Sequence, residues 1–370
     1  MQFPEGFVEK YEAILEDEAR DFLASFKREA VSAFRVNPLK ESQLSFADAI
    51  PNTPWGYYGK VSGKSPEHAT GLVYSQEPAA QMVAQVAQPS PSMKVLDLAA
   101  APGGKSTQLA AYLANQGVLV SNEISSKRAK ILVENMERFG ATNVVVINES
   151  ADRLAKVFKG YFDVIVLDAP CSGEGIFRKQ PDAMDYWSTD YPCQCASLQR
   201  EILEDAVTML AEGGRLIYST CTWSPEENEE IVHWLLDTYD FELLPVEHVN
   251  GMVAGIDLPE TARMYPHHFK GEGQFVAHLQ FKGENPAPKF KASKPNLSRE
   301  QQNLWQEFAQ KHLKISLTGL LQTFGDQLYL LPEMLPDLGK LKIARNGLHL
   351  GTFKKKRFEP SFALGLALKP

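Results

Sequence analysis

The chain has 370 residues, of which 44% are hydrophobic and 23% are charged. This composition is that of an ordinary globular protein and excludes a disordered or fibrous chain, and the length predicts two or three domains. No apolar run reaches the roughly 18 residues that a membrane helix needs, and the N-terminus lacks the apolar core of a secretory signal. The N-terminus therefore predicts a cytoplasmic protein. Because the four cysteines do not form a disulfide-rich pattern, we expect reduced thiols, and the heavily charged surface predicts a monomer.

The formal net charge of −8 is divided unevenly along the chain. Residues 285–370 hold 14 Lys and Arg against 6 Asp and Glu, whereas residues 1–284 hold 24 against 40. The C-terminal segment is therefore a basic module attached to an acidic body. Such a module can bind nucleic acid, or it can be a solvated surface that balances the acidic part, and charge alone does not decide between the two.

Three regions follow one another along the chain. Residues 1–90 open with two helical stretches, followed by a strand-like FRVNPL and a loop-rich section. In residues 91–284, the apolar strands KVLDLA, VLVSNE, NVVVIN, FDVIVLD and RLIYST alternate with helices, which predicts a parallel sheet covered on both faces. Residues 285–370 begin in the linker-like GENPAPKFKASKPNLS, and then predict a helix from Ser298 to His312 and short strands in DQLYLL, KIARNG and LHLGTF.

The segment KVLDLAAAPGGKS runs from a strand through a Gly-rich loop into a helix, an arrangement that presents backbone N–H groups to a ligand. The next strand ends on Glu123, 19 residues after Gly104, where a carboxylate can accept hydrogen bonds from two ribose hydroxyls. The main alternative is the P-loop of an ATPase, because GKS resembles the end of that motif. Ala99 stands where its first glycine should be, and the charge of Asp97 would repel phosphates, so a nucleoside cofactor is favoured over ATP.

Two cysteines follow strands of the same predicted sheet. FDVIVLDAP leads through Asp168 to Cys171, and RLIYST leads to Cys221. Ser224 and Glu227 have the spacing of a capping box, which predicts a helix whose N-terminal partial charge would help to lower the pKa of Cys221. One free cysteine is more often a small buried hydrophobic residue than a nucleophile. Two of them at the ligand-binding edge of one sheet favour a catalytic pair.

The segments LDLAAAPGGKS, DAPCSGEG and STCTWSPEENE resemble the signature motifs of the Sun/Nop-type RNA cytosine-C5 methyltransferases, and FRVNPLK and MYPHHFKGEGQFVAHL resemble their flanking motifs. The resemblance implies S-adenosylmethionine as the cofactor and methyl transfer to C5 of cytosine. Because C5 is a weak nucleophile, a thiolate must first add to C6. The resemblance assigns this addition to Cys221, assistance in product release to Cys171, and a contact with the cytosine base to Asp168.

The same resemblance implies a cofactor site at the Gly-rich loop. The loop surrounds the methionine end of the cofactor, Glu123 binds the ribose with Arg128 nearby, and Asn148 or Glu149 approaches the adenine, where many relatives carry an aspartate. The implied cofactor-binding residues are Ala99, Ala100, Ala101, Pro102, Gly103, Gly104, Lys105, Glu123, Arg128, Asn148, Glu149 and Asp168.

The stretch LHLGTFKKKRFEPSFALGLAL resembles the PUA-like RNA-binding domain of the RsmF branch of this family, whose members modify 16S ribosomal RNA. The expected architecture is therefore a small N-terminal α+β domain (1–90), a Rossmann-like methyltransferase core (91–284) and a PUA-like β-rich domain (285–370). Longer members continue into a further domain, so either this protein is naturally short or part of its RNA-binding surface is missing. The implied RNA-binding residues are Arg35, Asn37, Arg178, Lys179, Lys354, Lys355, Lys356 and Arg357.

Several alternatives remain open at this point. Transfer RNA is the alternative substrate, and Arg35 can equally be part of a structural ion pair. A Thr-Cys motif at Cys221, in addition to the Pro-Cys motif, favours RNA over DNA, and the presence of both cysteines argues against a catalytically silent RNA-binding relative. His267 and His268 lack a carboxylate or cysteine at ligand spacing, so we expect no metal site there and a structural or substrate-side role. Cys193 and Cys195 do not end a predicted strand, and we expect them to be unreactive.

Overall fold

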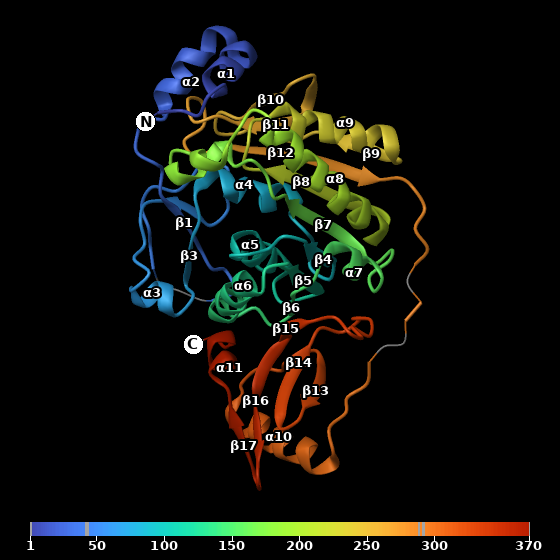
Figure 1. Ribbon diagram of the computed structural model, residues 1–370. Coiled ribbons are helices and arrows are strands. Elements are labelled where there is room, and N and C mark those ends of the chain that lie inside the picture. Colours follow the sequence, from blue (N-terminus) through green and yellow to red (C-terminus); the bar gives the residue numbers. More distant parts are fainter. Residues whose placement is uncertain (1, 41–43, 288, 291–292, 370) are drawn as a thin grey trace.

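The structure is a computed structural model that describes residues 2–40, 44–287, 289–290 and 293–369. Within this part of the chain, the strands form a ten-stranded central sheet, a three-stranded sheet near the N-terminus and a four-stranded sheet near the C-terminus. Figure 1 shows the C-terminal sheet at one end of the molecule and the first two helices at the other.

The first two helices have no hydrophobic core of their own. α1 (Phe7–Leu15) and α2 (Ala19–Ser25) are joined by the 3₁₀ turn η1 (Glu16–Glu18), and they confirm the two predicted helical stretches. We call residues 7–25 the helical hairpin. Its aromatic rings pack against rings from much later in the chain, and the buried members of this cluster are Phe7, Tyr11, Phe22, Phe26, Phe177, Trp187, Trp223 and Tyr265. The hairpin is therefore attached to the segments that follow Cys171 and Cys221.

The small N-terminal sheet follows the helical hairpin in the chain. Its strand order is β2-β1-β3, and both pairings are antiparallel. The predicted strand in FRVNPL corresponds to β1, the middle strand of this sheet. The elements are β1 (Ala33–Val36), β2 (Gly56–Tyr58), the short helix α3 (Pro66–Ala69) and β3 (Val73–Ser75).

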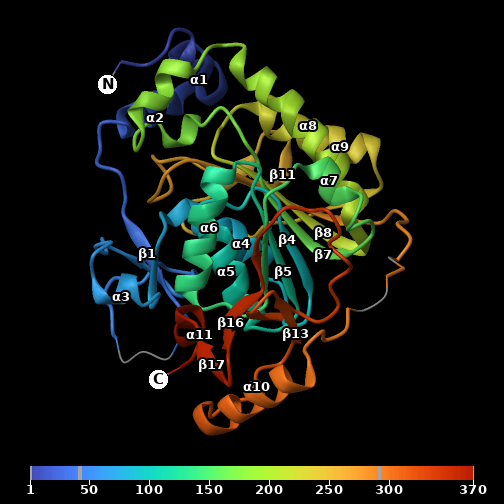
Figure 2. The same ribbon diagram turned by 60° about the horizontal axis from the view of Figure 1, so that its bottom comes forward.

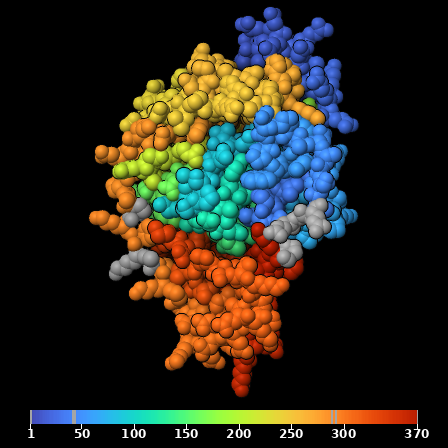
Figure 3. Space-filling view, turned by 180° about the vertical axis from the view of Figure 1, so that it is seen from behind, coloured from blue at the N-terminus to red at the C-terminus, as the bar shows by residue number. Residues whose placement is uncertain are grey.

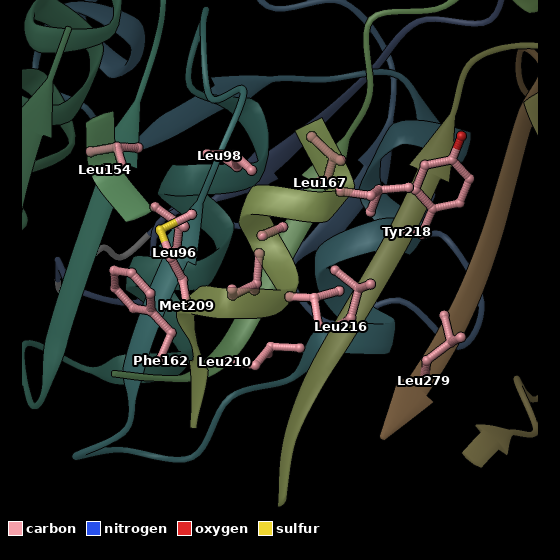
Figure 4. Close-up of a cluster of buried hydrophobic side chains, with 14 of the residues drawn as sticks. Leu96, Leu98, Leu154, Phe162, Leu167, Met209, Leu210, Leu216, Tyr218 and Leu279 are labelled. Carbon is pink, nitrogen blue, oxygen red and sulfur yellow. The ribbon is translucent and has the colours of Figure 1, made fainter. Parts of the chain in front are cut away.

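The central sheet confirms the predicted doubly wound core. Its parallel strands are β4 (Lys94–Asp97), β5 (Val118–Asn122), β6 (Val144–Ile147), β7 (Phe162–Asp168) and β8 (Leu210–Thr220), in the order β8-β7-β4-β5-β6. Successive residues of one strand face opposite sides, so that Leu96 belongs to one hydrophobic cluster and Val95 to the other. Figure 4 shows the first cluster, where Leu96 and Phe162 lie beside Met209.

Helices cover both faces of this sheet. The cluster around Val95 contains residues of α4 (Pro78–Ala87), α5 (Gly104–Leu113) and α6 (Ser126–Phe139). The cluster around Leu96 contains residues of α7 (Ala151–Ala155), α8 (Tyr191–Met209) and α9 (Glu229–Thr238). Two cores of this kind explain why the parallel strands read as continuous apolar runs in the sequence.

An antiparallel extension of the central sheet was not predicted. β12 (Gln274–Phe281) pairs with β8, and β9 (Phe241–Leu244), β10 (Val253–Gly255) and β11 (Leu258–Met264) complete this side. The sequence hides β11 because it contains Arg263, a fully buried charge that forms an ion pair of 2.6 Å with Glu229. A buried ion pair breaks the apolar pattern by which the other strands are recognised.

The C-terminal segment confirms the predicted helix, which is α10 (Arg299–His312) with a capping box at Ser298 and Gln301. The four-stranded sheet has the order β13-β14-β16-β17, from β13 (Leu320–Phe324), β14 (Gln327–Leu331), β16 (Leu348–Lys354) and β17 (Arg357–Pro360), and α11 (Phe362–Ala367) follows. Figure 2 shows α11 beside α6. Figure 3 shows this orange and red segment projecting from the body of the molecule.

One strand leaves the C-terminal module and joins the central sheet. β15 (Ile343–Asn346), which the sequence indicated as the strand KIARNG, pairs antiparallel with β6. We had expected it to lie with its neighbours in the small β module. It continues the central sheet because β6 is the last parallel strand and offers an unpaired edge.

Candidate active site

The Gly-rich loop lies between the end of β4 and the start of α5. Ser106 donates a hydrogen bond of 2.7 Å to one carboxylate oxygen of Asp97, and the other oxygen, Oδ1, is buried without a partner among the described residues. Burial raises the pKa of Asp97 to about 7. A buried acceptor without a donor is costly, so this oxygen is suited to a ligand that brings a donor of its own.

Arg35 supports this loop from behind. Its guanidinium donates hydrogen bonds of 2.7 Å to the carbonyl of Gly104, to the hydroxyl of Thr107 and to the side chain of Gln76. The side chain has no solvent exposure, and burial lowers its pKa to about 10. The interpretation of Arg35 as an RNA contact is therefore wrong for this conformation, because the side chain cannot reach a ligand outside the protein.

The carboxylate expected to bind ribose is in place at the end of β5. Glu123 is 2% exposed and accepts a hydrogen bond of 2.9 Å from the backbone N–H of Ser125. The guanidinium of Arg128 lies 3.5 Å from the other carboxylate oxygen of Glu123. It also donates a hydrogen bond of 2.7 Å to the carbonyl of Ala101 in the Gly-rich loop. The structure thus brings Glu123 and Arg128 to the loop, as expected. The next residue, Ile124, is 71% exposed and was not singled out from the sequence.

Asn148 and Glu149 follow β6 and are already engaged within the protein. The Asn148 amide donates to the carbonyls of Glu123 and Ile124, at 2.7 and 2.9 Å. Glu149 accepts from the backbone N–H of Lys342 at 2.9 Å and forms an ion pair of 3.2 Å with Arg153. The C-terminal segment therefore contacts the residue expected near the adenine. A direct contact of either side chain with adenine stays a prediction.

Cys171 and Cys221 lie together, as the sequence predicted for a catalytic pair. Their sulfur atoms are 3.2 Å apart and both residues are half-buried. The hydrogen bond between the two thiols, with burial as the second cause, raises the pKa of Cys171 well above its ordinary value. Cys171 is therefore the partner that holds its proton.

Three loops meet at this pair of sulfur atoms. The backbone N–H of Gly175 donates to the carbonyl of Cys221, and the N–H of Gly273 donates to the carbonyl of Gly175, both at 2.9 Å. A Cβ atom at position 175 would lie 2.7 Å from the Cys221 carbonyl, so a glycine is needed there. These contacts fix the backbone of Cys221 against the loop that carries Cys171.

The predicted capping box after Cys221 is wrong. A short 3₁₀ turn, η4 (Pro225–Glu227), follows Ser224, whose side chain makes no capping hydrogen bond, and the helix α9 begins only at Glu229. Glu227 instead accepts from the backbone and hydroxyl of Ser172, at 2.9 and 2.5 Å, and from Gln199 at 3.0 Å. Burial raises the pKa of Glu227 to about 7. Its carboxylate therefore links the Cys171 loop to the turn after Cys221.

Asp168 connects the cofactor loop to the cysteines. One of its carboxylate oxygens lies 2.7 Å from the ammonium of Lys105. The other accepts a hydrogen bond of 2.9 Å from the amide of Gln274. Burial alone would lower the pKa of Lys105, but the charge and hydrogen bond of Asp168, together with the charges of Asp97 and Cys221, outweigh the burial and raise this pKa. Lys105 thus brings a positive charge toward the sulfur of Cys221. Gln274 was not recognised from the sequence.

Two further RNA-binding predictions are corrected by burial. Asn37 has no exposure and donates to the carbonyls of Gly71 and Phe139, at 2.8 and 2.7 Å. The Arg178 side chain is 6% exposed and pairs with Glu272 at 2.8 Å. Both side chains hold segments of the protein together and cannot face RNA in this conformation. Lys179 is exposed, and its role stays a prediction.

The basic cluster lies far from the cysteines. Lys354, Lys355, Lys356 and Arg357 are all exposed and form the turn between β16 and β17. In Figure 1, β17 lies at the end of the molecule opposite to the helical hairpin. A contact of this turn with RNA stays a prediction, and it would be separate from the site of chemistry.

The histidines have a carboxylate partner that the sequence did not reveal. Glu18, from η1 of the helical hairpin, lies 3.0 Å from His267 and 2.6 Å from His268. Burial lowers the pKa of His267. The expectation that no third ligand accompanies these histidines is therefore wrong.

Of the other two cysteines, Cys193 is exposed, and burial raises the pKa of Cys195 to about 12.

The residues present fit S-adenosylmethionine. Its ammonium group can supply the donor that Asp97 lacks, and the paired ribose hydroxyls suit the carboxylate of Glu123. In the part of the chain that the structure describes, no helix is long and apolar enough to span a membrane. Fold and site together define an S-adenosylmethionine-dependent methyltransferase.

Three matches identify the family to which the chain belongs. The family of 16S rRNA methyltransferase RsmB/F matches residues 84–280, the N-terminal domain of 16S rRNA methyltransferase RsmF matches residues 3–78, and the RsmF rRNA methyltransferase first C-terminal domain matches residues 307–368. The chain is therefore a member of the RsmB/F methyltransferase family, with the accessory domains of its RsmF branch.

Individual relatives agree with this assignment. The chain is 33% identical to ribosomal RNA small subunit methyltransferase F of Shewanella loihica, over 94% of this chain and 78% of the relative. It is 34% identical to the protein of the same name from Serratia proteamaculans, over 94% and 79%. A methyltransferase homologue of Pyrococcus horikoshii aligns in structure with a TM-score of 0.64 and 31% identity, over 74% of this chain and 93% of that chain. NSun6 of the same organism, solved with SFG, shares the fold with a TM-score of 0.69 at 22% identity, over 76% and 99%.

Proposed function

We propose that this protein transfers a methyl group from S-adenosylmethionine to C5 of a cytosine in 16S ribosomal RNA, with Cys221 as the nucleophile. The observation that carries the proposal is the distance of 3.2 Å between the sulfur atoms of Cys221 and Cys171 at the edge of a cofactor-binding sheet. The names of the relatives support RNA of the small subunit over transfer RNA as the substrate. We expect the working form to be a cytoplasmic monomer.

The mechanism starts with Cys221. Its thiolate adds to C6 of the cytosine, which moves electron density onto C5 and makes that carbon a nucleophile. The cofactor supplies an electrophilic methyl group that C5 can accept. Asp168, held by Lys105 and Gln274, is positioned to hydrogen-bond the cytosine ring and to stabilise the adduct.

Release of the product requires two bonds to break. The proton on C5 passes to solvent water, the electron pair of the C5–H bond re-forms the C5–C6 double bond, and the C6–S bond breaks so that its electron pair leaves with the sulfur of Cys221. Cys171 keeps its proton in the structure because of its hydrogen bond to Cys221 and its burial. It can hand this proton to the departing sulfur, and so assist the elimination that frees the enzyme.

Binding and orientation fall to other residues of the chain. The free oxygen of Asp97 would accept from the ammonium of the cofactor, Glu123 would hold the ribose, and Ile124 would cover the adenine. The C-terminal module, residues 285–370, would bind RNA as a PUA-like domain, with its lysines on phosphates.

The test is mass spectrometry of nucleosides after incubation of small-subunit RNA or transfer RNA with the protein and S-adenosylmethionine. We expect 5-methylcytidine on small-subunit RNA with the wild type and a loss of at least about a thousandfold with Cys221→Ala, because the thiolate adduct is required. Cys171→Ala should form the adduct but release it slowly, so that protein bound covalently to RNA accumulates on a denaturing gel.

A matched control is Cys193→Ala, which removes an exposed thiol and should keep full activity. Product formed by Cys221→Ala would contradict the assignment of the nucleophile. Product on transfer RNA alone would replace the proposed substrate by its alternative.

A further inference from the structure

The helical hairpin and the loop after β11 meet at three side chains with metal-ligand chemistry. His267 Nε2 and His268 Nε2 both point at the same oxygen of Glu18, at 3.0 and 2.6 Å, and one ligand atom of each residue lies within 4.8 Å of the others. We infer that Glu18, His267 and His268 form a binding site for a divalent transition metal ion, with zinc as the best fit. This site is separate from the cysteines and does not rest on the proposed reaction.

The geometry of the cluster is close to that of a zinc site. Two imidazole nitrogens and one carboxylate oxygen are a recurrent set of three protein ligands, with bonds of about 2.0–2.2 Å to zinc. Tetrahedral ligands at that range lie roughly 3.3 Å from one another. The distance of 3.0 Å between Glu18 and His267 is already near this value, and the two rings are adjacent, with centroids 4.0 Å apart. Binding would therefore need small side-chain movements only.

The surroundings favour a cation and leave room for water. Glu16, Asp17 and Glu18 form the acidic turn η1, and Asp21 acts electrostatically on His267. The side chains of Glu18 and His268 are 56% and 37% exposed, so the remaining coordination positions can be filled by water. An acidic neighbourhood raises the local concentration of divalent cations.

The affinity of the site should be moderate. His267 Nδ1 is buried and has no hydrogen-bond partner among the described residues. Metal-binding histidines usually donate from their second nitrogen, and the loss of such support costs about 10–100-fold in affinity. We therefore expect micromolar rather than nanomolar binding of zinc.

A bound ion would clip the helical hairpin to the core. Glu18 belongs to the hairpin, whereas the two histidines follow β11 of the central sheet. The same hairpin carries Lys10 and Tyr11, whose side chains contact Glu174 in the loop that follows Cys171. Zinc would thus stabilise the attachment of a segment that borders the active site. Without zinc, the same three residues would form a hydrogen-bonded clamp.

The test is calorimetric titration of zinc chloride into the full, reduced chain at neutral pH. We expect one saturable site in the wild type, a Kd at least about tenfold higher for His268→Ala and for Glu18→Gln, and no change for His233→Ala, which removes an exposed histidine elsewhere. Saturating zinc should also raise the Tm of the wild type and of His233→Ala, but not that of His268→Ala.

Cobalt distinguishes this site from the thiols. Co²⁺ bound at the cluster should show visible d–d absorption without the near-ultraviolet charge-transfer band of a thiolate ligand. Three outcomes would overturn the inference and leave the hydrogen-bonded clamp as the explanation: no saturable binding, equal binding by wild type and His268→Ala, or a cobalt spectrum dominated by thiolate.

Discussion

The helical hairpin and the C-terminal module are attached to the same core by different means. The hairpin is attached through buried charged groups beside the cysteines, and the C-terminal module is attached through backbone pairing of β15 with β6, at the other side of the sheet. A region that shares buried charges with an active site is part of its scaffold. The region added at the sheet edge contacts the cofactor side of the site instead, where the backbone N–H of Lys342 donates to Glu149.

The buried charges of the hairpin converge on Glu174, which has no solvent exposure. Its carboxylate accepts from Lys10 at 3.3 Å, from Trp187 at 2.9 Å and from Ser224 at 2.7 Å, and it also accepts from the Tyr11 hydroxyl. Glu174 lies three residues after Cys171, and Ser224 three residues after Cys221. One carboxylate therefore connects the two cysteine loops and the helical hairpin to one another.

The junction of the C-terminal module has a different character. Arg345 on β15 is 4% exposed, and its hydrogen-bond partners among the described residues are the backbone carbonyls of Val144 at 3.3 Å and Ala141 at 2.9 Å. Burial lowers the pKa of this guanidinium to about 10. A charge that is buried against carbonyls alone contributes little net stability, because its desolvation offsets the hydrogen bonds.

The largest expected effect follows from Glu174→Ala. This change removes the buried carboxylate from Lys10, which keeps its ion pair with Glu226, and leaves three buried donors unsatisfied. It should lower the free energy of unfolding by about 3–5 kcal/mol and lower methyl transfer as well. Arg345→Met should change the free energy of unfolding by less than about 1.5 kcal/mol. Urea unfolding and methyl transfer measured on both variants check this. Equal losses of stability would remove the contrast between the two junctions.

A medium effect concerns pH and Glu227. Its pKa is raised to about 7 in the folded protein, from an ordinary value of 4.5, so the folded state favours the protonated form. The contribution of Glu227 to the free energy of unfolding is fully present below pH 4.5 and is lost as the pH rises through 7. As the pH rises from 5 to 8, the free energy of unfolding should fall in both proteins. We expect the fall to be about 2–3 kcal/mol smaller in Glu227→Gln than in the wild type.

A second buried carboxyl group, that of Asp97, titrates in the same range, because burial also raises its pKa to about 7. Because Asp97 is present in both proteins, its contribution cancels in the difference between the wild type and Glu227→Gln. Parallel stability curves for the two proteins would show that Glu227 does not titrate in this range.

The smallest expected effect is that of the basic turn. Replacing Lys354, Lys355 and Lys356 by Ala should leave the Tm unchanged, since all three side chains are exposed. RNA affinity should fall, and the slope of log affinity against log salt should decrease by about 2–3, if each lysine neutralises one phosphate. Filter binding at several salt concentrations measures this. The exposed pair Lys127 and Lys130 provides a matched control, and an equal fall with that pair would mean that the effect is not local.

The parallel core could be predicted from the sequence because its strands are apolar on both faces, and the cysteine pair could be predicted because both residues end such strands. Strand β11 could not, since its buried Arg263, which pairs with Glu229, disguises it. A sequence shows that a residue is charged but not whether it is covered by the fold. For this reason Arg35 and Arg178 were assigned to RNA, although each holds the protein together.

Contacts between distant segments were the other limit. Glu18 meets the histidines across an interval of 250 residues, which no local spacing reveals. Glu227 was interpreted through its neighbours in the chain, whereas its partners are Ser172 and Gln199. Local patterns predict where helices and strands begin, and long-range contacts decide what the side chains at their ends do.

The pairing of β15 with β6 also has a consequence for the synthesis of the chain. Strands β4 to β8 are complete long before residues 343–346 are made, so the edge of β6 has no neighbour during that time. An unpaired, apolar strand edge is where one unfinished chain can associate with another. A strand that is translated late therefore closes an edge that would otherwise be open to association with another chain.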